Sequence, residues 1–196
     1  RVLLLEKNPA CGKKLLITGK GRCNVTNNCP PEEVLKNVPR NGRFLYSSVY
    51  AFPPEAAMAF FEENGCALKT ERGNRVFPES DKAVDIVDAL VKNAKQNGVK
   101  FVEGTVTSFN TEKNVIKSVN LADGTVVDGD AFAICTGGLS YQSTGSTGDG
   151  YRLAESVGHT VTDIEPALIS LVASNGFVPK LQGLSRRNIS IKLRDG

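Results

Sequence analysis

The chain opens on an unbroken apolar run, Val2–Leu5, which ends in a single acid, Glu6. A short apolar run without alternation is typical of a strand that is buried on both faces of a parallel sheet. A loop rich in Gly, Lys and Arg follows this strand. The pattern therefore predicts a buried strand whose carboxyl end carries one acid. By itself, it fits equally a strand that happens to end in a solvated glutamate.

Helical spacing appears in the middle of the chain. Short helices are predicted from Pro31, over Phe44–Phe52 and over Pro54–Asn64, and the aromatic residues in this part are interpreted as core. Proline fits the first turn of a helix, where a backbone N–H has no partner. The clearest helix follows Ser80, which is predicted to be its N-cap. Its apolar face is formed by Ala83, Val84, Val87, Leu90, Val91 and Ala94.

Strand patterns surround this helix. A hairpin is predicted over residues 66–71 and 75–77, a long strand over 99–109, and a β-hairpin or meander over 114–120 and 125–131. An apolar strand over 132–135 is expected to run into a Gly-Gly turn. Further strand-like segments cover residues 160–164, 167–173 and 181–194.

The amino-acid composition limits the classes of protein to which the chain can belong. Apolar residues make up 40% and charged residues 23% of the 196 positions, which is ordinary for a globular protein. No apolar run reaches the ~20 residues that span a bilayer. The net charge of +3 and the absence of a basic helix or of aromatic-basic interleaving argue against nucleic acid as a partner. Five cysteines without CxxC spacing and one histidine exclude a typical zinc site and favour a reducing cytoplasm.

Positive charge gathers in the loop after the first strand. Residues 1–28 carry six basic side chains and one acid, a balance of +5. In dinucleotide-binding folds, an acid such as Glu6 accepts hydrogen bonds from a ribose hydroxyl, about 20 residues after a Gly-rich fingerprint. The cations are then suited to a diphosphate, and Gly12, Gly19 and Gly21 let the backbone approach a ligand closely. The fingerprint is expected to precede residue 1.

Four motifs carry a resemblance to a known family. They are LEKNPACGKKLLITGKGRCNVTN at residues 5–27, RVFPESDKAVD at 75–85, CTGG at 135–138 and SYQSTGSTGDGY at 140–151. Together they resemble the bacterial aminoacetone-oxidase-like family of FAD-binding flavoproteins, also described as NAD(P)/FAD-dependent oxidoreductases. Gln142 stands where the family pattern has proline, so the last loop is expected to be more flexible. The resemblance covers essentially the whole chain.

The resemblance implies a fold and a domain plan. The expected fold is α/β: a partial, doubly wound, Rossmann-like FAD-binding domain of the glutathione-reductase type with an added β-meander. Residues 1–166 would form this domain, and residues 167–196 a linker and the first strand of an inserted β-barrel substrate domain. The chain is interpreted as a fragment without the first Gly-rich strand, loop and helix and without the C-terminal part.

The resemblance also implies a cofactor site, within which no catalytic acid or base is assigned. By matching motifs, FAD would be held by Glu6, Lys7, Lys13, Lys14, Gly21, Arg22, Cys23, Asn24, Val25, Val106, Thr136, Gly137 and Gly138. Among these, Glu6 would bind the adenosine ribose, Val106 the adenine, and the segment 21–25 would approach the flavin.

The implied activity is hydride transfer between flavin and a small organic substrate or NAD(P)H. Charge-assisted hydrogen bonds contribute ~1.5–3 kcal/mol each. Because bonds of this kind to the diphosphate would be missing, the fragment is expected to carry no FAD and to be inactive. Two alternatives remain open: a noncatalytic interaction module with a dinucleotide fold, and an enzyme that uses NAD(P) alone.

Overall fold

The computed structural model describes residues 1–166, 176–181, 183, 184, 190 and 192. Two compact units divide the chain, Arg1–Val161 and Thr162–Gly196. The second unit contains one described 3-10 helix, η4 (Val178–Leu181). The expected strands over residues 167–173 and most of 181–194 lie outside the described residues.

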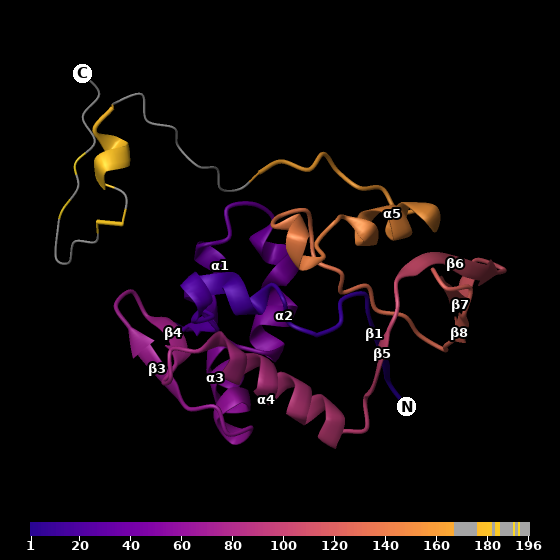
Figure 1. The fold of residues 1–196 in the computed structure, drawn as a ribbon, viewed down its shortest axis with the longest axis horizontal. Helices are drawn as coiled ribbons and strands as arrows, with labels where there is room; N and C mark the ends of the chain where they lie inside the picture. The colour runs from indigo at the N-terminus through magenta and orange to yellow at the C-terminus, as the bar shows by residue number, and fades with distance from the viewer. Residues whose placement is uncertain (167–175, 182, 185–189, 191, 193–196) are drawn as a thin grey trace. The chain divides into compact units, whose positions relative to one another are not determined.

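The first strand forms a parallel pair with a strand from the middle of the chain (Figure 1). Strand β1 (Leu3–Glu6) lies beside β5 (Lys100–Glu103), with Leu4 opposite Phe101 and Glu6 opposite Glu103. In the described part of the chain, β1 has no other strand partner. The predicted strand is confirmed, but burial on both faces is wrong, because Leu3 is 37% exposed.

A second sheet has three antiparallel strands in the order β2-β4-β3. Their bounds are Thr26–Asn27 for β2, Leu68–Glu71 for β3 and Arg75–Pro78 for β4. The predicted hairpin is confirmed as β3 and β4. Its turn places Gly73 and Asn74 at positive φ, a conformation that glycine and asparagine tolerate best. Strand β4 supplies the most buried residues of this sheet, Val76 and Phe77.

Four α-helices pack around this second sheet and the loop before it. They are α1 (Pro31–Lys36), α2 (Tyr46–Ala51), α3 (Pro54–Glu63) and α4 (Ala83–Gln96), with the 3-10 turn η2 (Gly42–Leu45) before α2. All follow the predicted segments. Figure 1 shows α3 and α4 side by side, below the hairpin.

Two predicted details of helix α4 are wrong. Its N-cap is Lys82, while the Ser80 hydroxyl accepts a hydrogen bond from the Lys82 N–H. The cause is Asp81, whose φ of 59° is not helical, so the N-cap falls two residues after Ser80. The buried face also differs from the prediction: Ile86 and Ala89 are buried, whereas Val84 and Leu90 are exposed. The core of this region consists of Cys23, Phe61, Cys66, Ala83, Ile86 and Ala89.

A third sheet is the predicted meander, with antiparallel order β6-β7-β8. Its strands are β6 (Val106–Glu112), β7 (Val115–Leu121) and β8 (Val126–Asp128). The single long strand predicted over residues 99–109 is wrong, since β5 ends at Glu103 and β6 begins at Val106. Between them, a Cβ on Gly104 would lie 2.9 Å from Leu121 Cδ1, so the chain turns where β7 packs closely against it.

The return from the meander carries no strand. Residues 132–138 are without ladder hydrogen bonds, so the predicted strand over 132–135 is wrong, as is the one over 160–164. A strand exists only with a partner backbone, and the described residues supply none here. The chain continues through the 3-10 turn η3 (Gln142–Thr144) into helix α5 (Asp149–Ser156), which confirms the predicted helix.

Candidate functional site

The candidate site lies at the carboxyl ends of β1 and β5. The two strands run parallel, so Glu6 and Glu103 end at the same edge, and the Gly104 N–H donates to the Glu6 carbonyl at 2.9 Å. Val106 begins β6 two residues further on. This edge is where α/β folds bind nucleotides. The structure thus brings together the strand-end acid and the residue predicted to hold adenine.

The Glu6 carboxylate is half-buried and partly engaged. Its Oε1 accepts hydrogen bonds from the Asn8 backbone N–H at 2.9 Å and from Asn8 Nδ2 at 2.8 Å. Asn8 also donates to the Thr144 carbonyl at 3.3 Å. Among the described residues, no donor reaches Glu6 Oε2. Asn8 therefore fixes the carboxylate while leaving one oxygen for a ligand hydroxyl.

Lys7 ties the strand end to a loop about 140 residues away in sequence. Its Nζ donates to Thr147 Oγ1 and to Asp149 Oδ2, both at 2.6 Å, and Thr147 donates to the same Asp149 oxygen at 2.9 Å. Hydrogen bonds from Lys7 and Thr147 hold the pKa of Asp149 below its ordinary value. Lys7 and Asp149 are each about a quarter exposed, so the pair is sheltered but not dry.

The next two lysines differ in their surroundings. Lys14 donates to the carbonyl and the hydroxyl of Ser140, and its Nζ lies 5.8 Å from the centre of the Tyr141 ring. Lys13 is exposed and makes no side-chain hydrogen bond in the described part of the chain. Lys13 is therefore available to an anionic ligand, whereas Lys7 and Lys14 hold the loop of residues 140–151 against the end of β1.

Residues 136–138 pack against the same loop. A Cβ on Gly150 would lie 2.5 Å from Thr136 Oγ1, and one on Gly137 would lie 3.0 Å from Ser146 Oγ. Gly145 in the same loop would place a Cβ 2.6 Å from Asn8 Nδ2. Glycine fits these positions because an added Cβ would collide with the side chains of Thr136, Ser146 and Asn8. The predicted sites Thr136, Gly137 and Gly138 thus join Glu6, Lys7 and Lys14 through the 140–151 loop.

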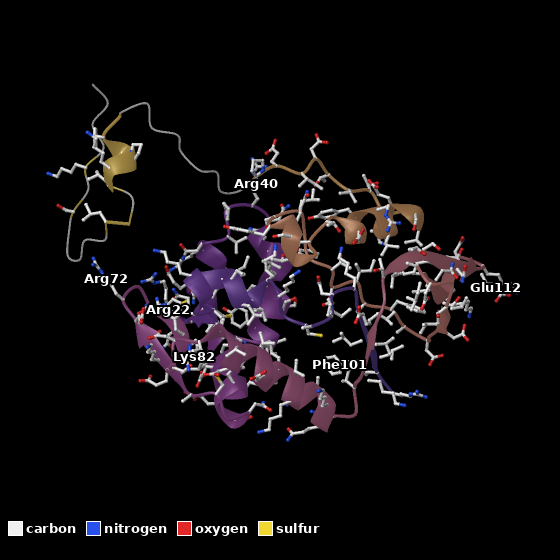
Figure 2. All side chains as sticks on the ribbon, viewed as in Figure 1. Arg22, Arg40, Arg72, Lys82, Phe101 and Glu112 are labelled. Atoms are coloured by element: carbon white, nitrogen blue, oxygen red, sulfur yellow. The ribbon has the colours of Figure 1, made fainter. Side chains whose placement is uncertain are left out.

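Arg22, by contrast, faces the hairpin of β3 and β4 (Figure 2). Its guanidinium donates to both oxygens of Glu71, at 2.8 and 3.3 Å, and to Asp81 at 3.0 Å. It also lies 4.0 Å from the centre of the Phe77 ring. Hydrogen bonding to the two carboxylates raises the pKa of Arg22 and lowers that of Glu71. Arg22 is occupied by protein partners in this structure.

The residues after Arg22 also pack on the hairpin. Cys23 is 3% exposed with a φ of 59°, and Val25 donates its N–H to the Val76 carbonyl at 2.9 Å. The Asn24 amide donates to that same carbonyl at 3.1 Å. Gly21, at a φ of 82°, is exposed. In the described residues, no side-chain hydrogen bond or ion pair joins the segment 21–25 to Glu6 or to the 140–151 loop.

Sequence reasoning missed several residues of this site. Asn8, Thr144, Thr147 and Asp149 hold Glu6 and Lys7, yet the sequence alone does not show which distant residues meet. The available signal was the dense run of hydroxyl and glycine residues at 140–151. His159 lies in a loop after α5, as the sequence favoured, and the described residues contain no cluster of side chains suited to a metal.

Two cavities lie elsewhere in the described structure. One of about 940 Å³ lies beside α4 and is lined by Cys66, Ser80 and Asp85, among others. The second, of about 750 Å³, lies between α1 and α3 and includes Tyr50 and Met58 in its lining. None of the predicted cofactor residues lines either cavity. The candidate site lies instead at an edge that is built by strand ends and a loop.

Comparison with known proteins identifies the family. Residues 1–194 match the HI0933-like protein Rossmann domain, and the chain belongs to this family. The predicted α/β, Rossmann-like class and the resemblance to flavoproteins are thereby confirmed. None of the helices in the described residues is both long and apolar enough to cross a membrane.

Curated relatives narrow the comparison further. The chain is 32% identical over 187 residues to a 3-dehydro-bile acid delta(4,6)-reductase of Clostridium scindens, covering 94% of this chain and 44% of the relative. It is 28% identical over 194 residues to the ribosomal RNA dihydrouridine synthase of Escherichia coli, covering 94% and 45%. The corresponding Haemophilus influenzae protein is 25% identical over 192 residues, covering 94% and 46%. The chain thus spans less than half the length of these relatives.

Proposed function

We propose that this chain is the FAD-binding part of a flavin-dependent reductase that acts on a carbon–carbon double bond conjugated to a carbonyl group. The observation that carries the proposal is the position of Glu6. It ends β1 at the carboxyl edge of a parallel strand pair, with one carboxylate oxygen free and a glycine-rich loop beside it. In dinucleotide-binding folds an acid at this place binds the ribose of the cofactor.

The residues at this edge fit FAD. Glu6 Oε2 is available to a ribose hydroxyl, and the exposed Lys13 is available to the diphosphate. Val106 offers its backbone N–H and C=O beside the strand ends for adenine. Thr136 and Gly137 lie in a segment without ladder hydrogen bonds, and Gly137, at a φ of 72°, has no Cβ that would block the approach of a ligand. The segment 21–25 is proposed to approach the flavin at its exposed residues Gly21 and Asn24, because Arg22, Cys23 and Val25 are bound to other parts of the chain.

The reactions that the relatives' names denote have one kind of chemistry in common. A 3-dehydro-bile acid with delta(4,6) double bonds carries alkenes in conjugation with its 3-carbonyl group. Uridine, which a dihydrouridine synthase reduces, carries its 5,6 double bond in conjugation with a ring carbonyl. Both substrates accept hydride at the carbon remote from the carbonyl and a proton at the adjacent carbon. FAD, when bound, supplies hydride transfer, and the protein supplies binding and orientation.

Two substrate classes follow from this chemistry. The first is a small unsaturated ketone, favoured by the higher identity to the bile acid reductase. The second is a uracil base in RNA, favoured by two relatives named as ribosomal RNA dihydrouridine synthases. NAD(P)H is the proposed electron donor in either case. The cytoplasm, where NAD(P)H is abundant, is the proposed compartment.

The experiment uses the full-length protein. Purified protein is expected to show the visible absorbance of oxidised flavin, to release FAD on denaturation and to be bleached by NAD(P)H without oxygen. Reoxidation is then followed with a conjugated enone, its saturated ketone as a matched control, and a uridine-containing RNA. If NAD(P)H bleaches the flavin but neither the enone nor the RNA reoxidises it, the proposed reaction is refuted.

A separate measurement concerns the 196 residues alone. We propose that they bind FAD far more weakly than the full-length protein, as the missing diphosphate contacts predict. Titration of FAD against both proteins, followed by flavin fluorescence, measures the difference. Equal affinity in the two titrations would show that residues 1–196 hold the whole site.

A further inference from the structure

An exposed aromatic surface lies on residues 40–52, outside the candidate site. We define the 40–52 surface by the side chains of Arg40, Arg43, Phe44, Tyr46, Tyr50 and Phe52. The exposed fractions of the four aromatic residues are 84% for Phe44, 55% for Tyr46, 40% for Tyr50 and 58% for Phe52. The interpretation of these aromatic residues as core is therefore wrong. A group of aromatic side chains that are this exposed often marks an interaction site.

The surface owes its exposure to local structure. Asn41, at a φ of 54°, starts the turn η2, which passes directly into the six-residue helix α2. Helix α2 is fixed to α1 because the Tyr50 hydroxyl donates to the Glu32 carboxylate at 2.5 Å. The rings of Tyr46 and Tyr50 lie 4.5 Å apart and are tilted by 30°. These rings are therefore held in place, with their remaining faces open to solvent.

Positive charge accompanies the aromatic residues. Residues 36–52 contain Lys36, Arg40 and Arg43 and no acid, a balance of +3 that equals the net charge of the whole chain. Lys36 pairs with Glu33 of α1 at 3.5 Å. Arg40, labelled in Figure 2, and Arg43 form no side-chain hydrogen bond or ion pair among the described residues. Two guanidinium groups are thus free to meet an anion.

Open aromatic faces beside free guanidinium groups suit one class of partner. Single-stranded RNA presents unstacked bases, which stack on Phe, Tyr and Arg, and phosphates, which pair with Arg. We propose that the 40–52 surface binds a single-stranded segment of RNA, which reverses the expectation from composition that nucleic acid is not a partner, because arginines and aromatic residues do lie close together in this segment. The inference rests on the proposed function, because it selects a uracil base in RNA as the substrate class.

A binding assay tests this proposal independently of catalytic activity. The full-length protein is titrated against a fluorescein-labelled oligouridine strand, with anisotropy as the readout, at several salt concentrations. Phe44→Ala and Phe52→Ala together are expected to weaken binding about tenfold or more, since each lost stack costs a substantial factor. Arg43→Gln is expected to weaken binding and to flatten the salt dependence by about one phosphate contact.

Matched controls keep the test specific. Arg72→Gln removes an exposed arginine from the β3–β4 turn, and Phe177→Ala removes a 56%-exposed phenylalanine from the second unit. Both are expected to bind oligouridine as the wild type does. The inference would be overturned if the variants of the 40–52 surface bound oligouridine as tightly as the wild type. It would also be overturned if these variants lost self-association of the protein and not its binding of RNA.

The two proposals fail in different ways. RNA binding that depends on Phe44 and Arg43, in a protein that reduces no conjugated double bond, would refute the proposed function and leave the surface intact. Reduction of an enone by a protein that does not bind oligouridine would refute the inference about the surface and leave the reductase intact.

Discussion

The two halves of the opening motif are held by different forces. Residues 6–14 meet the 140–151 loop through polar contacts such as those of Lys7 and Lys14, across more than 120 sequence positions. Residues 22–25 instead pack on the β3–β4 hairpin, with Cys23 buried and Arg22 over the Phe77 ring. One continuous motif thus joins a half-exposed edge, where we propose that the cofactor binds, to a segment that packs in the core. A continuous sequence motif need not serve one purpose throughout.

The largest effect is expected in the packed half. Phe77 is 2% exposed, so Phe77→Ala leaves a cavity under Arg22 and should lower the free energy of unfolding by about 3–5 kcal/mol. Urea denaturation of the full-length protein measures the change. Phe44→Ala, at 84% exposure, is the control and should change stability by about 0.5 kcal/mol or less. Similar losses in both variants would contradict the contrast drawn between the two halves.

The polar half should affect the cofactor before it affects stability. Glu6→Gln removes the charge from the proposed ribose ligand and keeps an acceptor for Asn8. A hydrogen bond to a charged group contributes about 1.5–3 kcal/mol, so FAD affinity should fall about ten- to a hundredfold. Flavin fluorescence titration measures this.

Glu103→Gln is the matched control for that experiment. Glu103 ends the neighbouring strand and is the register partner of Glu6, but it is not a proposed ligand. Its FAD affinity should stay at the wild-type value. An equal loss in both variants would indicate a general field effect at the strand ends and would refute a specific role for Glu6.

The pair between Lys7 and Asp149 should contribute a smaller, pH-dependent amount. The pKa of Asp149 is lowered in the folded protein, so its contribution is present at neutral pH and is lost as the pH falls through that lowered value. For a quarter-exposed pair, about 1 kcal/mol or less is expected at pH 7. The difference between wild type and Asp149→Asn should therefore shrink below pH of about 3.9.

Unfolding curves at a series of pH values check this behaviour. Asp128→Asn, which changes an exposed aspartate of β8 without a side-chain hydrogen bond in the described residues, serves as the control. It should leave the pH dependence of stability as in the wild type. A difference for Asp149→Asn that grows as the pH falls would contradict the lowered pKa.

Arg22→Lys should give the smallest change. Lysine keeps the charge but loses the planar fork that reaches both oxygens of Glu71, and it loses the stacking on Phe77. We expect a slightly lower melting temperature, with the difference narrowing in high salt because the network is partly exposed. Lys36→Arg, at an exposed pair in α1, should not alter the melting temperature. A larger loss for Arg22→Lys than for Asp149→Asn would reverse the order proposed here.

Local pattern predicted the elements that local physics decides. Helix α3 follows from proline at its first turn and α4 from helical spacing, and the hairpin follows from its Gly73-Asn74 turn. The apolar run Val2–Leu5 predicted the strand-end position of Glu6, and the family motifs predicted the Rossmann-like class. These features depend on residues near one another in sequence.

The misses share another cause, which is contact between distant segments. The long strand over 99–109 breaks because Leu121 packs against Gly104, and the strand over 132–135 has no partner in the described residues. The Ser80 cap fails because Asp81 adopts positive φ. The sequence likewise could not predict that Asp149 pairs with Lys7, because this pairing depends on how the 140–151 loop folds back onto the end of β1. Sequence patterns indicate the local conformational preference of a segment, whereas these outcomes depend on the residues that contact it in the folded chain.

The open side of β1 has a practical consequence. In the described residues, β1 pairs with β5 alone, which leaves the backbone of Leu3, Leu4 and Leu5 with an unpaired row of donors and acceptors on its other side. Such an apolar edge recruits further strands and drives aggregation. Preparations of these 196 residues should therefore be kept dilute, and a charged residue placed at Leu3 should improve their solubility.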